Sequence, residues 1–162
     1  MKLLSESIGI ERLAKIREGF RDEIANNFEH RAKPCSTCES PGSCCLDEHF
    51  VNVRVSRLEA AAIKKAVNDL EEESRSAIDA RLERIDPAAE FYACPLYESG
   101  VGCLVHQTAK PLPCIAHACY EQKEDLPPDE LLSTSELKVD QLNRHVYGRG
   151  EPVMPIHTAL RR

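Results

Sequence analysis

Apolar residues recur every three or four positions in the first part of the chain, between residues 8 and 29. The stripe consists of Ile10, Leu13, Ile16, Phe20, Ile24 and Phe28. This spacing follows one face of an α-helix, so it predicts an amphipathic helix whose stripe faces a core. Pro34 ends the element, because a proline disfavours helical backbone in the residue before it.

Apolar and polar residues then alternate over residues 50–56, where three valines are separated by Asn52 and Arg54. Alternation of this kind predicts a short, half-buried strand. Ser56 and Glu59 follow with the spacing of a capping box, in which each side chain satisfies a free amide of the first turn. A helix is therefore predicted to begin at Ser56.

Further helical segments are predicted downstream. No glycine or proline interrupts residues 56–86, which predicts one long helix or a helical hairpin with its bend near residues 71–73. Ser133 and Glu136 repeat the capping-box spacing, so another helix is predicted from Ser133. It should end near Gly148, since glycine is common just past a helix end. The tail after this glycine is predicted to be extended.

Composition indicates the fold class. Only 5% of the residues are aromatic and none is tryptophan, so the core must be aliphatic, which favours helices. We expect a mainly α fold, a small helical domain in which two irregular Cys-rich loops converge on a metal centre, with at most a short strand. The 162 residues suit a single metal-binding domain. It would have an N-terminal helix at 1–34, a cysteine-cluster core at 35–119, and a C-terminal helix and tail at 120–162.

Charge and hydropathy exclude several classes of partner. The net charge of −6 argues against binding to nucleic acid or to anionic membranes, which requires excess lysine and arginine. No stretch approaches the roughly 18 apolar residues of a membrane span. The N-terminus turns polar at Ser5 and Glu6 and lacks the apolar core of a secretory signal. We therefore expect a cytoplasmic protein whose thiols stay reduced.

The chemistry of the chain lies in eight cysteines, which form two banks separated by a cysteine-free helical stretch. The candidate metal ligands are Cys35, Cys38, Cys44 and Cys45 in the first bank and Cys94, Cys103, Cys114 and Cys119 in the second. A C-x-x-C pair such as Cys35 and Cys38 can grip one ion from a tight turn. Four thiolates complete a zinc site or hold a 4Fe–4S cluster, so eight could serve two centres, or one centre with spares.

The adjacent cysteines Cys44 and Cys45 pose a geometric problem. Successive side chains in extended backbone point to opposite sides, so these two sulfurs are not expected to bind one ion. Either one is a ligand and the other is buried, or they serve different centres. His106 and His117 could each replace a sulfur in a mixed site, although an ordinary surface role is the stronger interpretation of both.

Three other interpretations of the cysteines are weaker. A disulfide scaffold does not suit the expected compartment. Burial as small apolar side chains could explain two to four of the eight, but hardly all of them. A thioredoxin-like redox pair needs a βαβ context, which the pattern does not indicate.

A C-x-x-C pair, an adjacent CC pair and a short strand leading into a helix follow one another in an order that resembles the YkgJ-type cysteine-cluster family, a CxxCxxCC zinc- or iron-chelating domain. The later part of the resemblance consists of Cys94-Pro95-Leu96, Cys103, Pro111-x-Cys114 and Cys119. The resemblance covers about half of the chain and implies metal or iron–sulfur binding. The first loop departs from the family, because five residues from Glu39 to Ser43 precede the CC pair, and Lys110 stands where the family often has arginine.

Three functional hypotheses follow. The first is a protein holding an iron–sulfur cluster or zinc, in electron transfer or in support of a partner enzyme. The second is a zinc-stabilised protein-interaction module without redox activity, and the third is an enzyme with a reactive cysteine or catalytic zinc. No catalytic residue can be assigned, and any partner is expected to be a protein.

Overall fold

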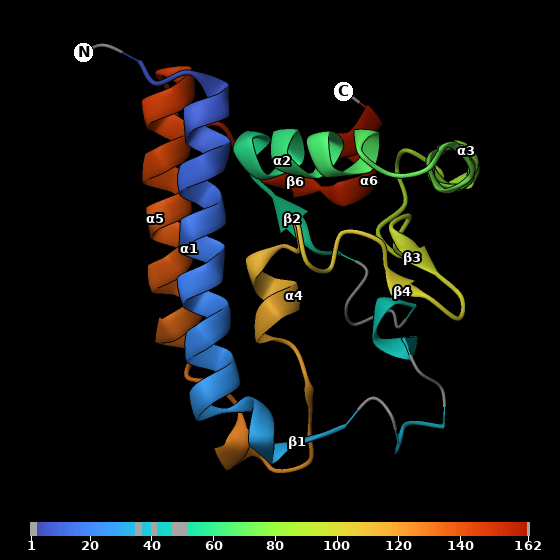
Figure 1. Cartoon of the computed structure of the whole chain (residues 1–162), viewed down its shortest axis with the longest axis vertical. Helices are drawn as coiled ribbons and strands as arrows, with labels where there is room; N and C mark the ends of the chain where they lie inside the picture. Colours follow the sequence, from blue (N-terminus) through green and yellow to red (C-terminus); the bar gives the residue numbers. More distant parts are fainter. Residues whose placement is uncertain (1–2, 35–36, 40–41, 47–51, 162) are drawn as a thin grey trace. The chain divides into compact units, whose positions relative to one another are not determined.

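The computed structural model describes residues 3–34, 37–39, 42–46 and 52–161, apart from the side chain of Ser43. In this part of the chain the protein is mainly helical, with six α-helices and strands of only two residues each (Figure 1). The expected mainly α class is therefore confirmed. None of the described helices combines the length and apolar character needed to cross a membrane.

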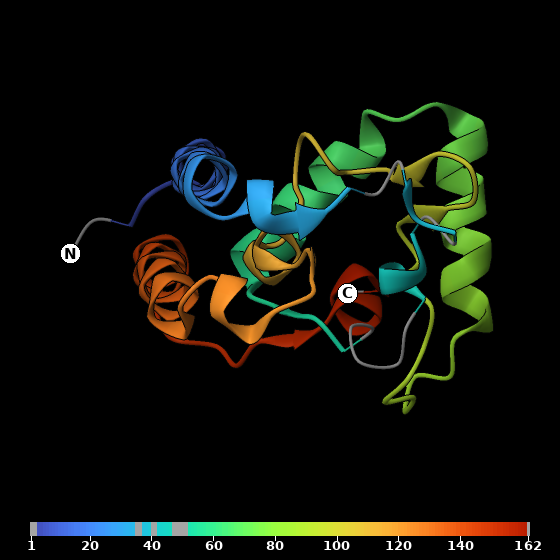
Figure 2. The same ribbon diagram turned by 90° about the horizontal axis from the view of Figure 1, so that it is seen from below.

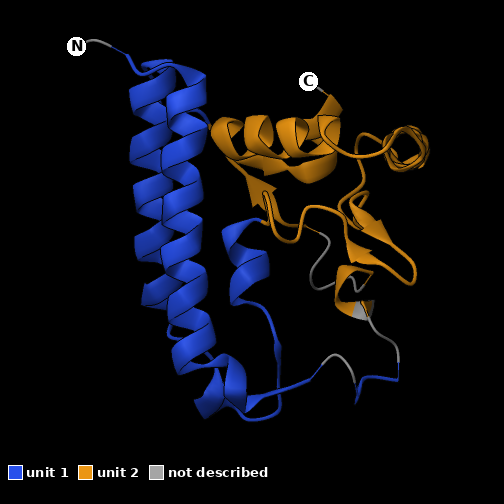
Figure 3. Ribbon diagram, in the orientation of Figure 1, with its two compact units in different colours: residues 1–39, 111–151 blue, residues 40–110, 152–162 orange. Residues whose placement is uncertain are grey.

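The chain divides into two compact units, each built from two separate stretches (Figure 3). Unit 1 comprises Met1–Glu39 and Pro111–Glu151. Unit 2 comprises Ser40–Lys110 and Pro152–Arg162. The expectation of one metal-binding domain over residues 1–162 stays a prediction.

Two long helices form the body of unit 1. Helix α1 spans Glu6–Asn27 and α5 spans Asp129–Tyr147, and they lie side by side (Figures 1 and 2). They are antiparallel, because the N–H of Leu4, just before α1, donates to the C=O of His145, near the end of α5, at 2.9 Å. Their buried apolar residues are Leu13, Phe20 and Ile24 in α1 and Val139, Leu142 and Val146 in α5.

The ends of these helices follow local chemistry. The amphipathic helix predicted at residues 8–29 is confirmed and begins slightly earlier, because the Ser5 hydroxyl accepts a hydrogen bond from the N–H of Ile8. Helix α5 begins before Ser133, so the predicted capping box there is wrong, and the Ser133 hydroxyl donates instead to the C=O of Glu130 at 3.2 Å. Gly148 ends α5 as predicted, with φ 77°.

The remaining elements of unit 1 are short. Helix α4 spans Leu112–Ala116, and single 3₁₀ turns occupy Glu29–Arg31 and Lys123–Asp125. Strand β1, Ala32–Lys33, pairs antiparallel with β5, Cys119–Tyr120, so that Lys33 lies opposite Cys119. The pairing places Ala32 and Lys33, which precede the first cysteine-rich loop in the sequence, beside Cys119 at the end of the second.

Unit 2 begins its regular structure at β2, Arg54–Val55, which pairs antiparallel with β6, Met154–Pro155. Within the described residues the predicted strand at 50–56 is thus reduced to two residues, and its first two residues lie outside the described part of the chain. Helix α2, Arg57–Asn68, follows directly. Its predicted capping box is confirmed, with Ser56 and Glu59 each bonding the backbone N–H of the other.

The long segment after Ser56 forms two helices, α2 and α3, with α3 spanning Glu72–Arg84. The single-helix alternative is wrong, and the break lies at residues 69–71. Figure 1 shows α3 end-on and α2 from the side, so the two helices cross and do not lie antiparallel. The extended tail is also wrong in part, because Ile156–Arg161 forms helix α6. Burial of Ile156 and Ala159 one turn apart explains the helix.

The core of unit 2 is aliphatic and draws on α2, α3, α6 and the segment at residues 94–110. Its buried residues are Val55, Ala60, Ile63, Ile78, Leu82, Leu96, Val105, Ala109, Ile156 and Ala159. Cys94 and Cys103 pack against this cluster and are themselves partly buried. The core therefore supports the second cysteine-rich segment directly.

Candidate metal centre

The two units divide the cysteines differently from the two banks of the sequence. Unit 2 contains Cys44 and Cys45 from the first bank with Cys94 and Cys103 from the second. Unit 1 contains the others, of which Cys35 lies outside the described residues; the described ones are Cys38, Cys114 and Cys119. Each unit therefore combines cysteines that lie far apart in the chain.

The first pair of unit 2 lies on a 3₁₀ turn, η3, at Ser43–Cys45. The turn is closed by the N–H of Cys45, which donates to the C=O of Gly42 at 2.9 Å. Neighbouring side chains on such a turn are about 120° apart and not opposed as in extended backbone. The thiols of Cys44 and Cys45 accordingly share a side-chain hydrogen bond. The extended backbone assumed for this pair is wrong, so the geometric argument against their binding one ion does not apply.

The second pair of unit 2 lies at the two ends of a small hairpin. Strand β3, Tyr97–Glu98, pairs antiparallel with β4, Gly102–Cys103, and the N–H of Leu104 donates to the C=O of Leu96 at 2.9 Å. The hairpin fixes Cys103 opposite Tyr97. Tyr97 itself lies three residues after Cys94.

Two contacts join the η3 turn to this hairpin. The N–H of Cys94 donates to the C=O of Cys45 at 3.1 Å. Gly42 lies against the ring of Tyr97 so closely that a Cβ atom at this position would overlap the ring. Its φ of 81° also favours glycine. The four cysteines are thus held on two loops that touch.

The pKa values show that the four thiols of unit 2 interact. The hydrogen bond with Cys44 raises the pKa of the Cys45 thiol most, followed by burial and then by the charges of Cys44, Cys94 and Cys103. Burial raises the pKa of Cys94 from 9.0 to about 11, and the neighbouring Cys103 also raises it. Burial likewise raises the pKa of Cys103. Without a cation nearby, the thiols of Cys45, Cys94 and Cys103 therefore keep their protons near neutral pH.

Other groups act in the opposite direction and favour thiolates. Backbone N–H groups of Leu96 and Tyr97 hydrogen-bond to Cys94 and lower its pKa, and the N–H of Val105 does the same for Cys103. The positive charge of Arg81 lowers the pKa of Cys94. Lys110 acts on Cys103 in the same way. Burial outweighs these groups, yet they are aimed at the sulfurs where a thiolate-ligated centre requires them.

Unit 1 positions its cysteines on three elements. Cys114 lies on α4 and Cys119 on β5, where it is exposed, while Cys38 lies shortly after β1. His117 ends α4 and is exposed, and in unit 2 His106 is exposed as well. The exposure of both histidines agrees with the surface role favoured for them.

The donor atoms of unit 2 suit the expected metals chemically. Four sulfurs are the ligand set of a structural zinc ion or a 4Fe–4S cluster, and the seven described cysteines are free thiols. Within the described ranges no group of three or more His, Cys, Asp or Glu residues is arranged to hold a metal ion as it stands. The sulfurs of unit 2 would therefore have to close further around the metal.

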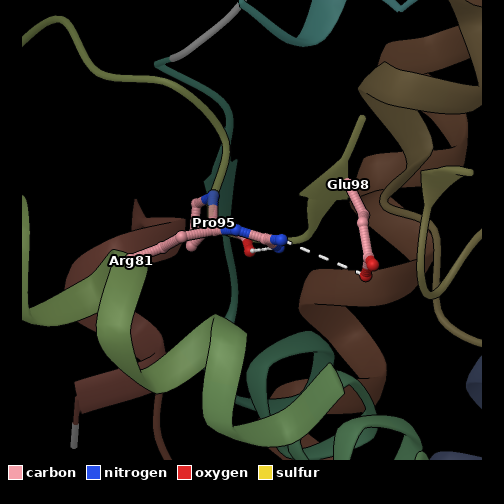
Figure 4. Close-up of polar contacts among 3 residues, drawn as sticks. All are labelled: Arg81, Pro95 and Glu98. Atoms are coloured by element: carbon pink, nitrogen blue, oxygen red, sulfur yellow. Dashed lines mark hydrogen bonds and ion pairs between the residues drawn. The ribbon is translucent and has the colours of Figure 1, made fainter. Parts of the chain in front are cut away.

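Sequence reasoning did not find Arg81. It lies on α3, 14 residues before Pro95, and its Nη1 donates to the Pro95 C=O at 3.2 Å (Figure 4). An arginine on a helix face carries no local signal of a role near cysteines. Arg81 is found beside the Cys94 loop only in the structure, because the segment that follows Cys94 packs against α3.

Comparisons with protein-family models, with curated proteins and with solved structures find no match to this chain. The resemblance to the YkgJ-type family therefore stays a prediction.

Proposed function

We propose that this protein binds a metal centre through the thiolates of Cys44, Cys45, Cys94 and Cys103 in unit 2. The observation that carries the proposal is that these cysteines, from both banks, lie on two loops joined by the hydrogen bond from the N–H of Cys94 to the C=O of Cys45, and the other three thiols raise the pKa of Cys45. A metal cation would replace the protons and offset the repulsion between the resulting thiolates. The centre would be an iron–sulfur cluster acting in electron transfer or in support of a partner enzyme, or zinc.

The backbone amides that hydrogen-bond to Cys94 and Cys103 support the iron–sulfur form. Hydrogen bonds to cluster sulfurs set the reduction potential of such centres, so this arrangement suits a redox role.

The contact between Cys44 and Cys45 favours the second candidate, a zinc-stabilised protein-interaction module. The hydrogen bond between their thiols raises the pKa of Cys45, and both residues lie on one 3₁₀ turn, which supports their binding one tetrahedral zinc ion. A zinc ion there would join the η3 turn to the hairpin and contribute folding free energy.

The deciding experiment is elemental analysis and a visible spectrum on protein purified without oxygen. A 4Fe–4S centre gives brown protein with iron and sulfide, whereas a zinc centre gives colourless protein with stoichiometric zinc. Protein that contains neither metal, and takes up neither on reconstitution, would overturn the proposal.

The ligands can be assigned by alkylating the metal-loaded protein and mapping the protected cysteines by mass spectrometry. We expect protection of the four unit 2 cysteines, lost after chelation. Cys94→Ser should abolish metal binding by this set, and Cys119→Ser, at an exposed site in unit 1, is the matched control that should retain it. The reverse result would show that the centre is not in unit 2. Protection of the unit 1 cysteines as well would indicate that all eight are ligands.

A further inference from the structure

Arg81 contacts two residues of the segment that runs from Cys94 into strand β3. Its Nη1 donates to the C=O of Pro95, the residue after Cys94, at 3.2 Å. Its Nη2 lies 4.0 Å from Oε2 of Glu98, which is opposite Gly102 and so beside Cys103. Figure 4 shows the side chain extending from α3 to both groups.

From this geometry we propose that Arg81 is a positioning residue of the cysteine centre, which holds the Cys94 loop and offsets the negative charge of the metal-loaded thiolates. The charge-offsetting role rests on the proposed function. The role in holding the Cys94 loop does not, and it is tested below on metal-free protein.

The charge balance gives the reason. Four thiolates around a divalent ion carry a net charge of about −2, whereas the four protonated thiols are neutral. A nearby cation therefore favours the loaded centre over the metal-free one. Arg81 has 29% of its side-chain surface exposed, so water screens its charge only in part. Arginine also keeps its charge at every relevant pH.

Glu98 moderates this effect. One of its carboxylate oxygens, Oε2, is buried and accepts no hydrogen bond within the described residues, and it is the oxygen that faces Arg81. The carboxylate neutralises part of the guanidinium charge. Replacing it by an amide should leave more of that charge available to the sulfurs.

The first test measures zinc affinity of the full chain by competition with a chromophoric chelator near neutral pH. Arg81→Gln should weaken binding roughly three- to tenfold, as expected for loss of one partly screened charge. Arg81→Lys should restore much of the loss, and Glu98→Gln should tighten binding. Arg84→Gln, an exposed position on the same helix, is the matched control and should change nothing.

Two outcomes of this test would overturn the inference. One is equal affinity of Arg81→Gln and Arg84→Gln. The other is a lysine variant as weak as the glutamine variant, since the charge would then have no effect. Far-UV circular dichroism checks that each variant folds. If Arg81→Gln does not fold, the zinc affinities of Arg81→Lys and Glu98→Gln still test the inference.

The second test uses metal-free protein, so it holds even if the wild type takes up no zinc and the proposed function fails. Arg81 holds the Cys94 loop through the C=O of Pro95, and the N–H of Cys94 donates to the C=O of Cys45. Arg81→Gln should therefore loosen this loop and speed hydrogen exchange of the Cys94 N–H severalfold, whereas Arg84→Gln should leave the rate unchanged. Equal exchange rates in the two variants would overturn the role of Arg81.

Discussion

The capping box of α2 allows a stability prediction whose size follows from three hydrogen bonds. The N–H of Glu59 donates to the Ser56 hydroxyl oxygen at 3.2 Å, and that hydroxyl donates to Oε2 of Glu59 at 2.9 Å. The N–H of Ser56 donates to the same Oε2 at 2.8 Å. Both residues are buried, with 5% and 8% of their surface exposed.

Ser56→Ala removes the first two of these bonds and leaves the third. Loss of the cap costs about 1 kcal/mol. Loss of one donor to a buried carboxylate adds about 1 kcal/mol, since water cannot fully replace it. We therefore expect the free energy of unfolding to fall by about 2 kcal/mol, which lowers the urea midpoint by about 1 M at a typical dependence on denaturant.

The assay is urea unfolding followed by circular dichroism, and the chain contains a matched control. Ser133 and Glu136 have the same spacing, but Ser133 lies inside α5 and caps nothing. Ser133→Ala should change the free energy of unfolding by less than about 0.5 kcal/mol. Equal effects of the two substitutions, or no effect of Ser56→Ala, would refute the assignment of the cap.

Three other predictions concern unit 2. Gly42→Ala should weaken metal binding, because its Cβ would displace the Tyr97 ring and separate the two cysteine loops; unchanged zinc affinity by chelator competition would contradict this. Metal-free protein should lose stability as the pH rises from 9 toward 11, because the raised pKa of Cys94 makes the folded state hold its proton more tightly; urea midpoints across this range should fall less in Cys94→Ser. Arg161→Met should cost about 1–2 kcal/mol in the same assay, because the guanidinium donates to carbonyls at the end of α3, while Arg84→Met should be close to neutral.

Elements whose pattern is local could be predicted from the sequence. The stripe of α1, the glycine that ends α5 and the capping box at Ser56 depend on residues within a few positions of one another. The predicted start of α5 at Ser133 was wrong. Pro128 and the acidic residues Asp129 and Glu130 begin the helix before this serine. Two signals competed there, and the earlier one prevailed.

The tail shows how tertiary packing overrides a local pattern. Residues 156–161 are too few to form a stable helix alone. They become helical because Ile156 and Ala159 complete a core supplied by distant segments. No property of the tail by itself indicated this.

The sequence shows which cysteines form the candidate site but not how the fold groups them. Their number predicts a metal centre, and their order along the chain suggests two banks, whereas each compact unit contains cysteines from both banks. The η3 turn and the β3–β4 hairpin pair Cys45 with Cys94 by a backbone hydrogen bond, and such contacts depend on topology. Arg81 likewise approaches the Cys94 loop only through the path of the chain.

The pairing of β2 with β6 has a consequence for biosynthesis. Unit 2 takes Ile156 and Ala159 into its core, so this half of the protein cannot finish folding on the ribosome until residues beyond 156 have been translated. At about 5–20 residues per second, the thiols of Cys44 and Cys45 would wait several seconds for their neighbours. On the proposed function, the metal would therefore be held most securely once residues 156–161 have joined this core.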